Sequence, residues 1–192
     1  MKKNKKLLNN FMQKNNIFIL CFKRNTDIET ILTRIEKTLE LKNLSILKNK
    51  QGNPSIYQLT TLVGEVSISH TDNLSLYLFT KNKDALGIDI QPIIENRETI
   101  NNFLSEAEKA ILSEDNLFLE STVLWTYKEA FVKSIGVGFM THPKNICCAN
   151  ILHKKVGAEG VILYHKKVYS IKILERITIK NNVISALVII NK

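Results

Sequence analysis

The segment from Leu86 to Gln91 constrains the fold most, because its apolar and polar residues alternate strictly. Strand side chains point alternately to opposite faces, so its three aliphatic residues share one face and Gly87, Asp89 and Gln91 share the other. The aliphatic face is expected to pack in a core. The opposite face carries an acid that a purely structural strand does not need.

A second segment, residues 124–135, has the periodicity of a helix. Trp125, Glu129 and Lys133 recur every fourth residue and therefore lie along one side. The simplest interpretation is a surface ion pair between Glu129 and Lys133, which would contribute about 0.2–0.5 kcal/mol. Because large aromatic side chains usually seek burial, Trp125 predicts that this side is partly covered as well. Both charges would then need partners.

Apolar runs and helical patterns are interspersed along the rest of the chain. Strands are expected at 17–22, 66–69, 74–79, 147–152, 168–175 and 183–190. Three helices are expected: one that follows the capping-box pattern Thr26-x-x-Glu29, one that begins at Ser105, and one over residues 124–135 that ends at Gly136. Similar residues open the strands at 74 and 183, which hints at duplication. The pattern predicts an α+β fold of two pseudo-duplicated subdomains, each a small, mostly antiparallel sheet packed with helices. The polar stretch 81–84 suggests a boundary between residues 1–82 and 83–192.

Composition narrows the functional classes. No apolar run approaches the ~18–20 residues of a membrane-spanning helix, and polar residues after the basic start interrupt any export signal. The three cysteines, Cys21, Cys147 and Cys148, lack metal-ligand spacing, so we expect reduced thiols, the adjacent pair in a buried strand. We expect a monomeric protein of the cytoplasm, without a membrane partner.

The net charge of +9 is unevenly distributed. Residues 83–129 hold 4 basic and 10 acidic side chains, whereas residues 1–50 hold 12 and 4, and residues 130–192 hold 10 and 2. The basic flanks could attract an anionic ligand or an acidic protein partner. A nucleic-acid-binding protein is the less favoured interpretation, because no recognised motif is present and the central segment is acidic.

Five motifs in order resemble those of one enzyme family. They are Gly52-Asn53-Pro54, Ser67-Ile68-Ser69-His70, Gly87-Ile88-Asp89, Phe103-Leu104-Ser105-x-x-Glu108 and Trp125-x-x-Lys128-Glu129-Ala130-x-x-Lys133. Together they resemble the 4′-phosphopantetheinyl transferases of the Sfp type, over about residues 50–139. The resemblance implies the transferase fold and transfer of the phosphopantetheine arm of coenzyme A to a serine of an acidic apo acyl or peptidyl carrier protein, with release of 3′,5′-ADP.

The resemblance also implies roles for individual residues. Asp89 and Glu129 would bind Mg²⁺, Gln91 could add an amide oxygen, and Lys133 would neutralise the reacting phosphate. Glu129 is also the expected acceptor of the serine proton, directly or through a water. Glu108 matches an acid of the intervening motif and is expected to belong to the catalytic group.

The remaining implied contacts are with coenzyme A. Ser69 and His70 would hold its 3′-phosphate, Lys128 lies beside the site, and Lys50 and Gly52 lie near the nucleotide. The chain departs from the family pattern at two positions: Gln91 stands where a glutamate is usual, and Asn53 replaces the lysine of a Gly-Lys-Pro turn. These departures keep open an alternative, a relative that binds coenzyme A or a carrier protein without transfer.

Overall fold

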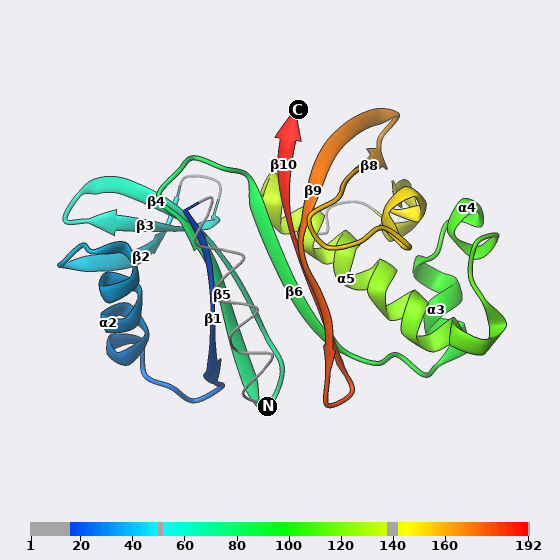
Figure 1. Cartoon of the computed structure of the whole chain (residues 1–192), viewed down its shortest axis with the longest axis horizontal. Coiled ribbons are helices and arrows are strands. Elements are labelled where there is room, and N and C mark those ends of the chain that lie inside the picture. The colour runs from blue at the N-terminus through cyan, green and yellow to red at the C-terminus, as the bar shows by residue number, and fades with distance from the viewer. Residues whose placement is uncertain (1–15, 50–51, 138–141, 192) are drawn as a thin grey trace.

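A computed structural model describes residues 16–49, 52–137 and 142–191. It contains two five-stranded antiparallel sheets that lie side by side (Figure 1). The first consists of β1 (Ile17–Lys23), β2 (Leu44–Lys48), β3 (Pro54–Gln58), β4 (Thr61–His70) and β5 (Leu74–Thr80). The second consists of β6 (Leu86–Pro92), β7 (Ile146–Cys147), β8 (Glu159–Tyr164), β9 (Lys167–Ile179) and β10 (Asn182–Asn191).

The two sheets repeat one topology. The strand order is β1-β5-β4-β3-β2 in the first sheet and β6-β10-β9-β8-β7 in the second, so in each the first strand pairs with the last. In each, a helical segment follows the first strand. This segment is α2 (Ile28–Leu39) in the first half and α3 (Arg97–Phe103), α4 (Glu106–Lys109) and α5 (Leu117–Ile135) in the second. The expected α+β class with two antiparallel sheets is confirmed.

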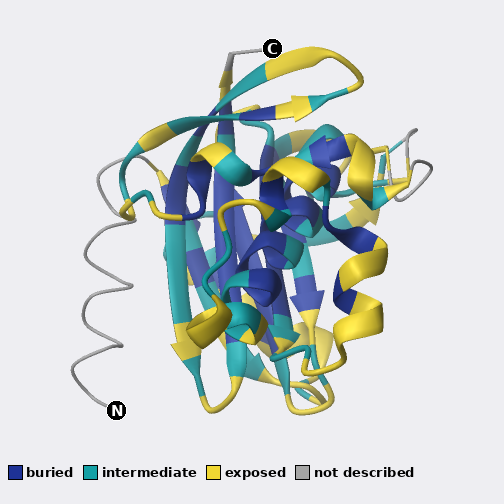
Figure 2. Cartoon of the chain, turned by 90° about the vertical axis from the view of Figure 1, so that its right-hand side faces the viewer, coloured by how far each residue is buried: buried dark blue, intermediate teal, exposed yellow. Residues whose placement is uncertain are grey.

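The molecule is built in layers, with α2 outside the first sheet and with α5, followed by α3 and α4, outside the second (Figure 1). Helix α2 packs on the outer face of the first sheet around Ile35 and Phe79. The inner faces of the two sheets meet in a second apolar cluster, which contains Ile19, Leu78 and Ile88. Helix α5 lies on the outer face of the second sheet, where its buried surface is covered further by α3 (Figure 2).

Local sequence explains where the helices begin and end. Asp27, not Thr26 as expected, caps α2 by accepting the backbone N–H of Thr30. At α4, where a helix was expected to start from Ser105, Ser105 and Glu108 form a reciprocal capping box. Helix α5 ends as expected at Gly136, whose φ of 73° is left-handed.

Two predicted elements differ from the structure. Helix α5 begins at Leu117, seven residues earlier than expected, because Leu119 and Val123 continue its buried face. The expected strand at 147–152 is wrong beyond Cys147. There the backbone N–H of Cys148 donates to Glu108, and a 3₁₀ turn, η4 (Ala149–Ile151), follows. None of the described helices is both long and apolar enough to cross a membrane.

Candidate active site at the junction of the two sheets

The junction runs along the edge of β6 that does not pair with β10. Antiparallel strands direct alternate N–H groups to opposite edges, and the N–H groups of Ile88 and Ile90 lie on this outer edge. They donate to the hydroxyls of Ser67 at 3.1 Å and Ser69 at 3.3 Å, both on β4 of the first sheet. Two serine side chains thus replace a partner strand and attach the edge of one sheet to the other.

Gly87 allows α5 to lie directly on β6. A Cβ atom at this position would be 1.8 Å from the carbonyl oxygen of Ala130, so any side chain here would force the helix away. This close approach places the helix residues near Asp89, on the same face of β6. The predicted alternation of β6 is confirmed, because its aliphatic residues pack between the sheets while Gly87 and Asp89 face α5.

Asp89 and Lys133 form the ionic centre of the site. The Lys133 ammonium donates to Asp89 Oδ1 at 2.7 Å and to the backbone carbonyl of Ile88 at 3.1 Å. Asp89 is 5% exposed, and its Oδ1 also accepts the hydroxyl of Ser69 at 2.7 Å. Its Oδ2 is buried and has no hydrogen-bond partner among the described residues. A buried, unsatisfied carboxylate oxygen is costly for folding alone, so Oδ2 is a candidate position for a ligand contact.

Glu129 lies on α5, partly buried, within electrostatic reach of this pair. Burial, and then repulsion from Asp89, raise its pKa to about 7, while Lys133 acts in the opposite direction. Two carboxylates that repel each other in a half-buried position are a suitable environment for a cation. The covered charged side predicted from Trp125 agrees with this burial, since Trp125 packs on Phe103 with ring centroids 4.9 Å apart.

Gln91 and His70 are close in sequence to residues of this centre but form no hydrogen bond or ion pair with Asp89, Glu129 or Lys133 in the described part of the chain. Gln91 is half-buried near the end of β6, two residues beyond Asp89 on the same side of the strand. His70, at the end of β4, is exposed. Gly52 is also exposed, with a φ of 84°, and Lys50 lies outside the described residues.

Glu108 and Lys128 lie elsewhere, in a fully buried ion pair. Both side chains are 0% exposed, and their charged atoms are 2.7 Å apart. Lys128 also donates to the carbonyls of Phe103 and Pro143, and Glu108 also accepts the backbone N–H of Cys148. The sequence interpretation placed Glu108 in the catalytic group and Lys128 beside the site, among the coenzyme A contacts. Their complete burial favours a structural role in which they connect α5 to α4 and to the chain around residue 143.

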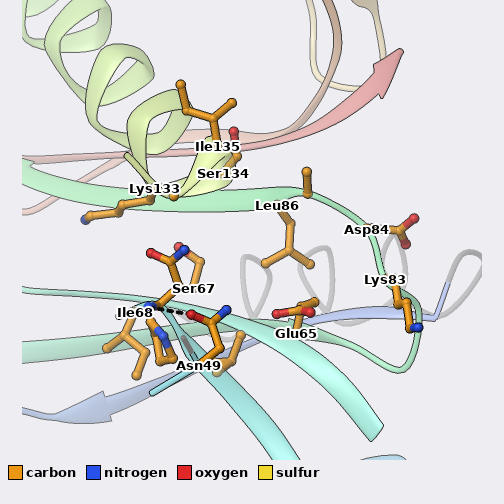
Figure 3. Close-up of a pocket in the computed structure, with 15 residues that line it drawn as sticks. Asn49, Glu65, Ser67, Ile68, Lys83, Asp84, Leu86, Lys133, Ser134 and Ile135 are labelled. Carbon is orange, nitrogen blue, oxygen red and sulfur yellow. Dashed lines mark hydrogen bonds between the residues drawn. The ribbon is translucent and has the colours of Figure 1, made fainter. Parts of the chain in front are cut away.

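A pocket of about 380 Å³ opens beside Lys133, between the first sheet and the end of α5. Lys133 lies at one end, and Glu65, Lys83 and Asp84 lie toward the other (Figure 3). Asn53 forms part of the wall and packs against Gly136, where an added Cβ would be 2.2 Å from the Asn53 amide nitrogen. The pocket therefore combines parts of both halves of the chain.

Sequence reasoning named Ser67 in a motif without giving it a role, and it missed Glu65. Ser67 lines the pocket as well as binding the β6 edge, and Glu65, also in the pocket wall, accepts the hydroxyl of Ser55 at 2.9 Å. The signal for Ser67 was present, because Ser67 and Ser69 alternate with Val66 and Ile68 along one strand. Glu65 carried no signal, since a single acid in a strand has many ordinary roles.

The residues present fit a divalent cation with few protein ligands. Among the described residues, no group of three or more histidine, cysteine, aspartate or glutamate side chains could hold a metal ion. The free oxygen of Asp89 and the carboxylate of Glu129 could nevertheless offer two hard oxygen ligands, and the amide oxygen of Gln91 could offer a third. Mg²⁺ typically uses one or two carboxylates together with phosphate oxygens and water, so this donor set suits it.

Comparison with known proteins agrees with this geometry. A family model, ACPS, described as the 4′-phosphopantetheinyl transferase superfamily, matches residues 85–186. The match covers all five strands of the second sheet up to the middle of β10, and it includes Asp89, Glu129 and Lys133. No curated protein sequence matches the chain.

Proposed function

Because the chain belongs to the 4′-phosphopantetheinyl transferase superfamily, we propose that it acts as an Sfp-type enzyme on carrier proteins. Family membership indicates phosphopantetheine transfer in general. The specific proposal is transfer of the 4′-phosphopantetheine arm of coenzyme A to a serine of an acidic apo acyl or peptidyl carrier protein. The observation that carries it is the cluster of Asp89, Lys133 and Glu129, with one unpartnered buried carboxylate oxygen, beside a pocket made by both sheets.

Asp89 and Glu129 would hold the Mg²⁺ that the family usually employs, with Gln91 offering its amide oxygen. When bound, Mg²⁺ supplies positive charge to the pyrophosphate oxygens of coenzyme A. Lys133 supplies further positive charge. A lysine has three N–H donors, and two of these already hold Asp89 and the Ile88 carbonyl. The third is available to an oxygen of the transferred phosphate at the wall of the pocket.

The transfer needs positioning and charge neutralisation more than covalent help from the protein. The serine oxygen of the carrier attacks the phosphorus that bears the pantetheine arm, a new P–O bond forms, and the bond to 3′,5′-ADP breaks. The serine proton must be accepted, and Glu129 is the candidate acceptor, directly or through a water. The negative charge that develops leaves on the 3′,5′-ADP.

We assign the coenzyme A side of the site to residues 1–82 and the metal and catalytic side to residues 83–192. Exposed His70 and Gly52 suit contacts with the nucleotide, as does the neighbouring Lys50. Lys128 and Glu108 are more suitable as structural supports, because neither is accessible to a ligand in the described fold.

The decisive experiment uses the full chain with Mg²⁺, coenzyme A and a panel of apo carrier proteins of fatty-acid, polyketide and peptide synthesis. Intact-mass measurement is expected to show one carrier gaining the phosphopantetheine arm, and loss of the gain when EDTA replaces Mg²⁺. A carrier whose target serine is replaced by alanine is the control. Tight binding of coenzyme A with no mass gain on any carrier would instead support the alternative, a relative that binds without transfer.

A further inference from the structure

We propose that Ser69 is a positioning residue for Asp89: its hydroxyl holds one carboxylate oxygen so that the other stays free for the divalent cation. This inference rests on the proposed function, because it concerns the metal site of that reaction. It differs from the role that the motif suggested for Ser69, a direct contact with a phosphate of coenzyme A.

The hydrogen bonds of Ser69 leave no proton for a phosphate. Ser69 is 5% exposed, and its hydroxyl donates to Asp89 Oδ1 at 2.7 Å while it accepts the N–H of Ile90 at 3.3 Å. A hydroxyl has a single O–H donor. Because the N–H of Ile90 occupies an acceptor site of the oxygen, the proton is directed toward Asp89.

The two oxygens of Asp89 are consequently different. Oδ1 accepts from both Ser69 and Lys133, whereas Oδ2 is buried without a partner among the described residues. Two donors on one oxygen fix the rotation of the carboxylate, and a fixed ligand loses less conformational freedom when a cation binds. Hydrogen-bond partners of metal ligands commonly change metal affinity or activity by about 10–100-fold when removed.

Ser67 provides a matched control on the same strand. It is 4% exposed, and its hydroxyl accepts the N–H of Ile88 at 3.1 Å, just as Ser69 accepts the N–H of Ile90. Only Ser69 adds a bond to Asp89. Both serines come from the first sheet, and Asp89 comes from the second. The metal ligand of one half of the chain is therefore oriented by the other half.

The test compares Ser69→Ala with Ser67→Ala in the full chain, with folding checked by circular dichroism. Mn²⁺ is the probe, and the electron paramagnetic resonance signal of free Mn²⁺ measures its affinity without coenzyme A. Calorimetry in EDTA measures coenzyme A affinity without metal. Ser69→Ala is expected to weaken Mn²⁺ binding about tenfold or more and to leave metal-free coenzyme A binding near wild type. Ser67→Ala is expected to retain wild-type Mn²⁺ affinity.

A second pair of variants tests the role of the Ser69 hydroxyl without the loss of side-chain volume that alanine causes. Ser69→Thr keeps the hydroxyl and Ser69→Val replaces it with a methyl group of similar size, so Mn²⁺ binding is expected to be stronger in the threonine variant. Equal Mn²⁺ affinity in the two members of either pair would overturn the proposal. So would a loss of metal-free coenzyme A affinity in Ser69→Ala that matches its loss of Mn²⁺ affinity, or wild-type protein that binds no Mn²⁺. The carrier-protein assay tests the proposed function separately, since transfer can occur whether or not Ser69 orients Asp89.

Discussion

Two lysines of α5, five residues apart, form ion pairs of equal length and opposite character. Lys128–Glu108 and Lys133–Asp89 both have N···O distances of 2.7 Å, yet the first pair is 0% exposed at both side chains and the second is 29% and 7% exposed. At about 100° per residue, the two lysines lie on different sides of the helix. One side of α5 thus carries a buried ion pair and another side carries a partly exposed ion pair at the candidate active site.

The pairs differ most in hydrogen-bond saturation. All three donors of Lys128 have acceptors, and both oxygens of Glu108 accept hydrogen bonds. In the other pair, Lys133 has two acceptors among the described residues, and Asp89 Oδ2 has no partner there. A saturated buried pair fixes the segments around it, whereas an unsaturated one can accept a ligand without breaking existing contacts.

The strongest test of this comparison removes one charge from the saturated pair. Glu108→Gln leaves the Lys128 ammonium buried without a counter-charge, and we expect a loss of about 3–5 kcal/mol in the free energy of unfolding. Urea denaturation at neutral pH measures it. The double variant Glu108→Gln with Lys128→Met should recover much of the loss, because no buried charge remains. A single-variant cost below about 1 kcal/mol, typical of an exposed pair, would show that the pair does not fix the structure.

The equivalent change in the open pair should affect transfer and spare stability. Asp89→Asn keeps the acceptor for Ser69 and Lys133 but removes the negative charge that a cation needs. We expect carrier modification to fall about 100- to 1,000-fold, which corresponds to about 3–4 kcal/mol in the activation barrier. Initial rates by mass spectrometry measure this. Near-wild-type rates in Mg²⁺ would show that Asp89 does not bind the metal. A stability loss as large as that of Glu108→Gln would show that the two ion pairs do not differ in their structural role.

Sequence patterns predicted the residues of the open site better than those of the saturated pair, although Lys133 forms its ion pair with Asp89 and not with Glu129, the partner expected from the helix spacing. The alternation around Asp89 and the four-residue spacing of Glu129 and Lys133 depend only on the geometry of a strand and a helix, and the structure brings these three residues together. Lys128 lies in the same motif, but its burial depends on the carbonyls of Phe103 and Pro143, which are distant in sequence. The partner of the Ser69 hydroxyl is likewise set by the packing of one sheet on the other, so a local pattern cannot identify it.

In EDTA, Glu129 is expected to make the stability of the protein depend on pH. Burial and Asp89 raise the pKa of Glu129 to about 7 in the folded protein. The ordinary pKa of a glutamate, which applies to Glu129 in the unfolded chain, is 4.5. Between pH 4.5 and pH 7 the unfolded chain therefore loses the carboxyl proton of Glu129 while the folded protein keeps it, so the contribution of Glu129 to the free energy of unfolding falls as pH rises. Above pH 7 the ionised Glu129 lowers the free energy of unfolding by its full amount, and below pH 4.5, where Glu129 is protonated in both states, it lowers it by nothing.

Glu129→Gln should remove that penalty and identify its source. We expect the variant to be about 1–2 kcal/mol more stable than wild type at pH 8, after allowance for the partial exposure of the side chain, and equal to it at pH 4. Urea denaturation at several pH values measures the difference. A constant difference across the range would show that Glu129 titrates normally and that the Asp89 centre is more open to water than its burial indicates.

The smallest expected effect comes from adding an acid to the open pair. Gln91 follows Asp89 on the same side of β6 and is half-buried, so Gln91→Glu would place a third carboxylate at the proposed metal site. We expect the Mg²⁺ concentration for half-maximal transfer to fall about threefold to tenfold, or about 1 kcal/mol, with the maximal rate little changed. An Mg²⁺ titration of the initial rate measures both values. Since an added carboxylate would only repel its neighbours if no cation lay between them, a loss of transfer that excess Mg²⁺ cannot restore would mean that Gln91 serves the reaction through its amide.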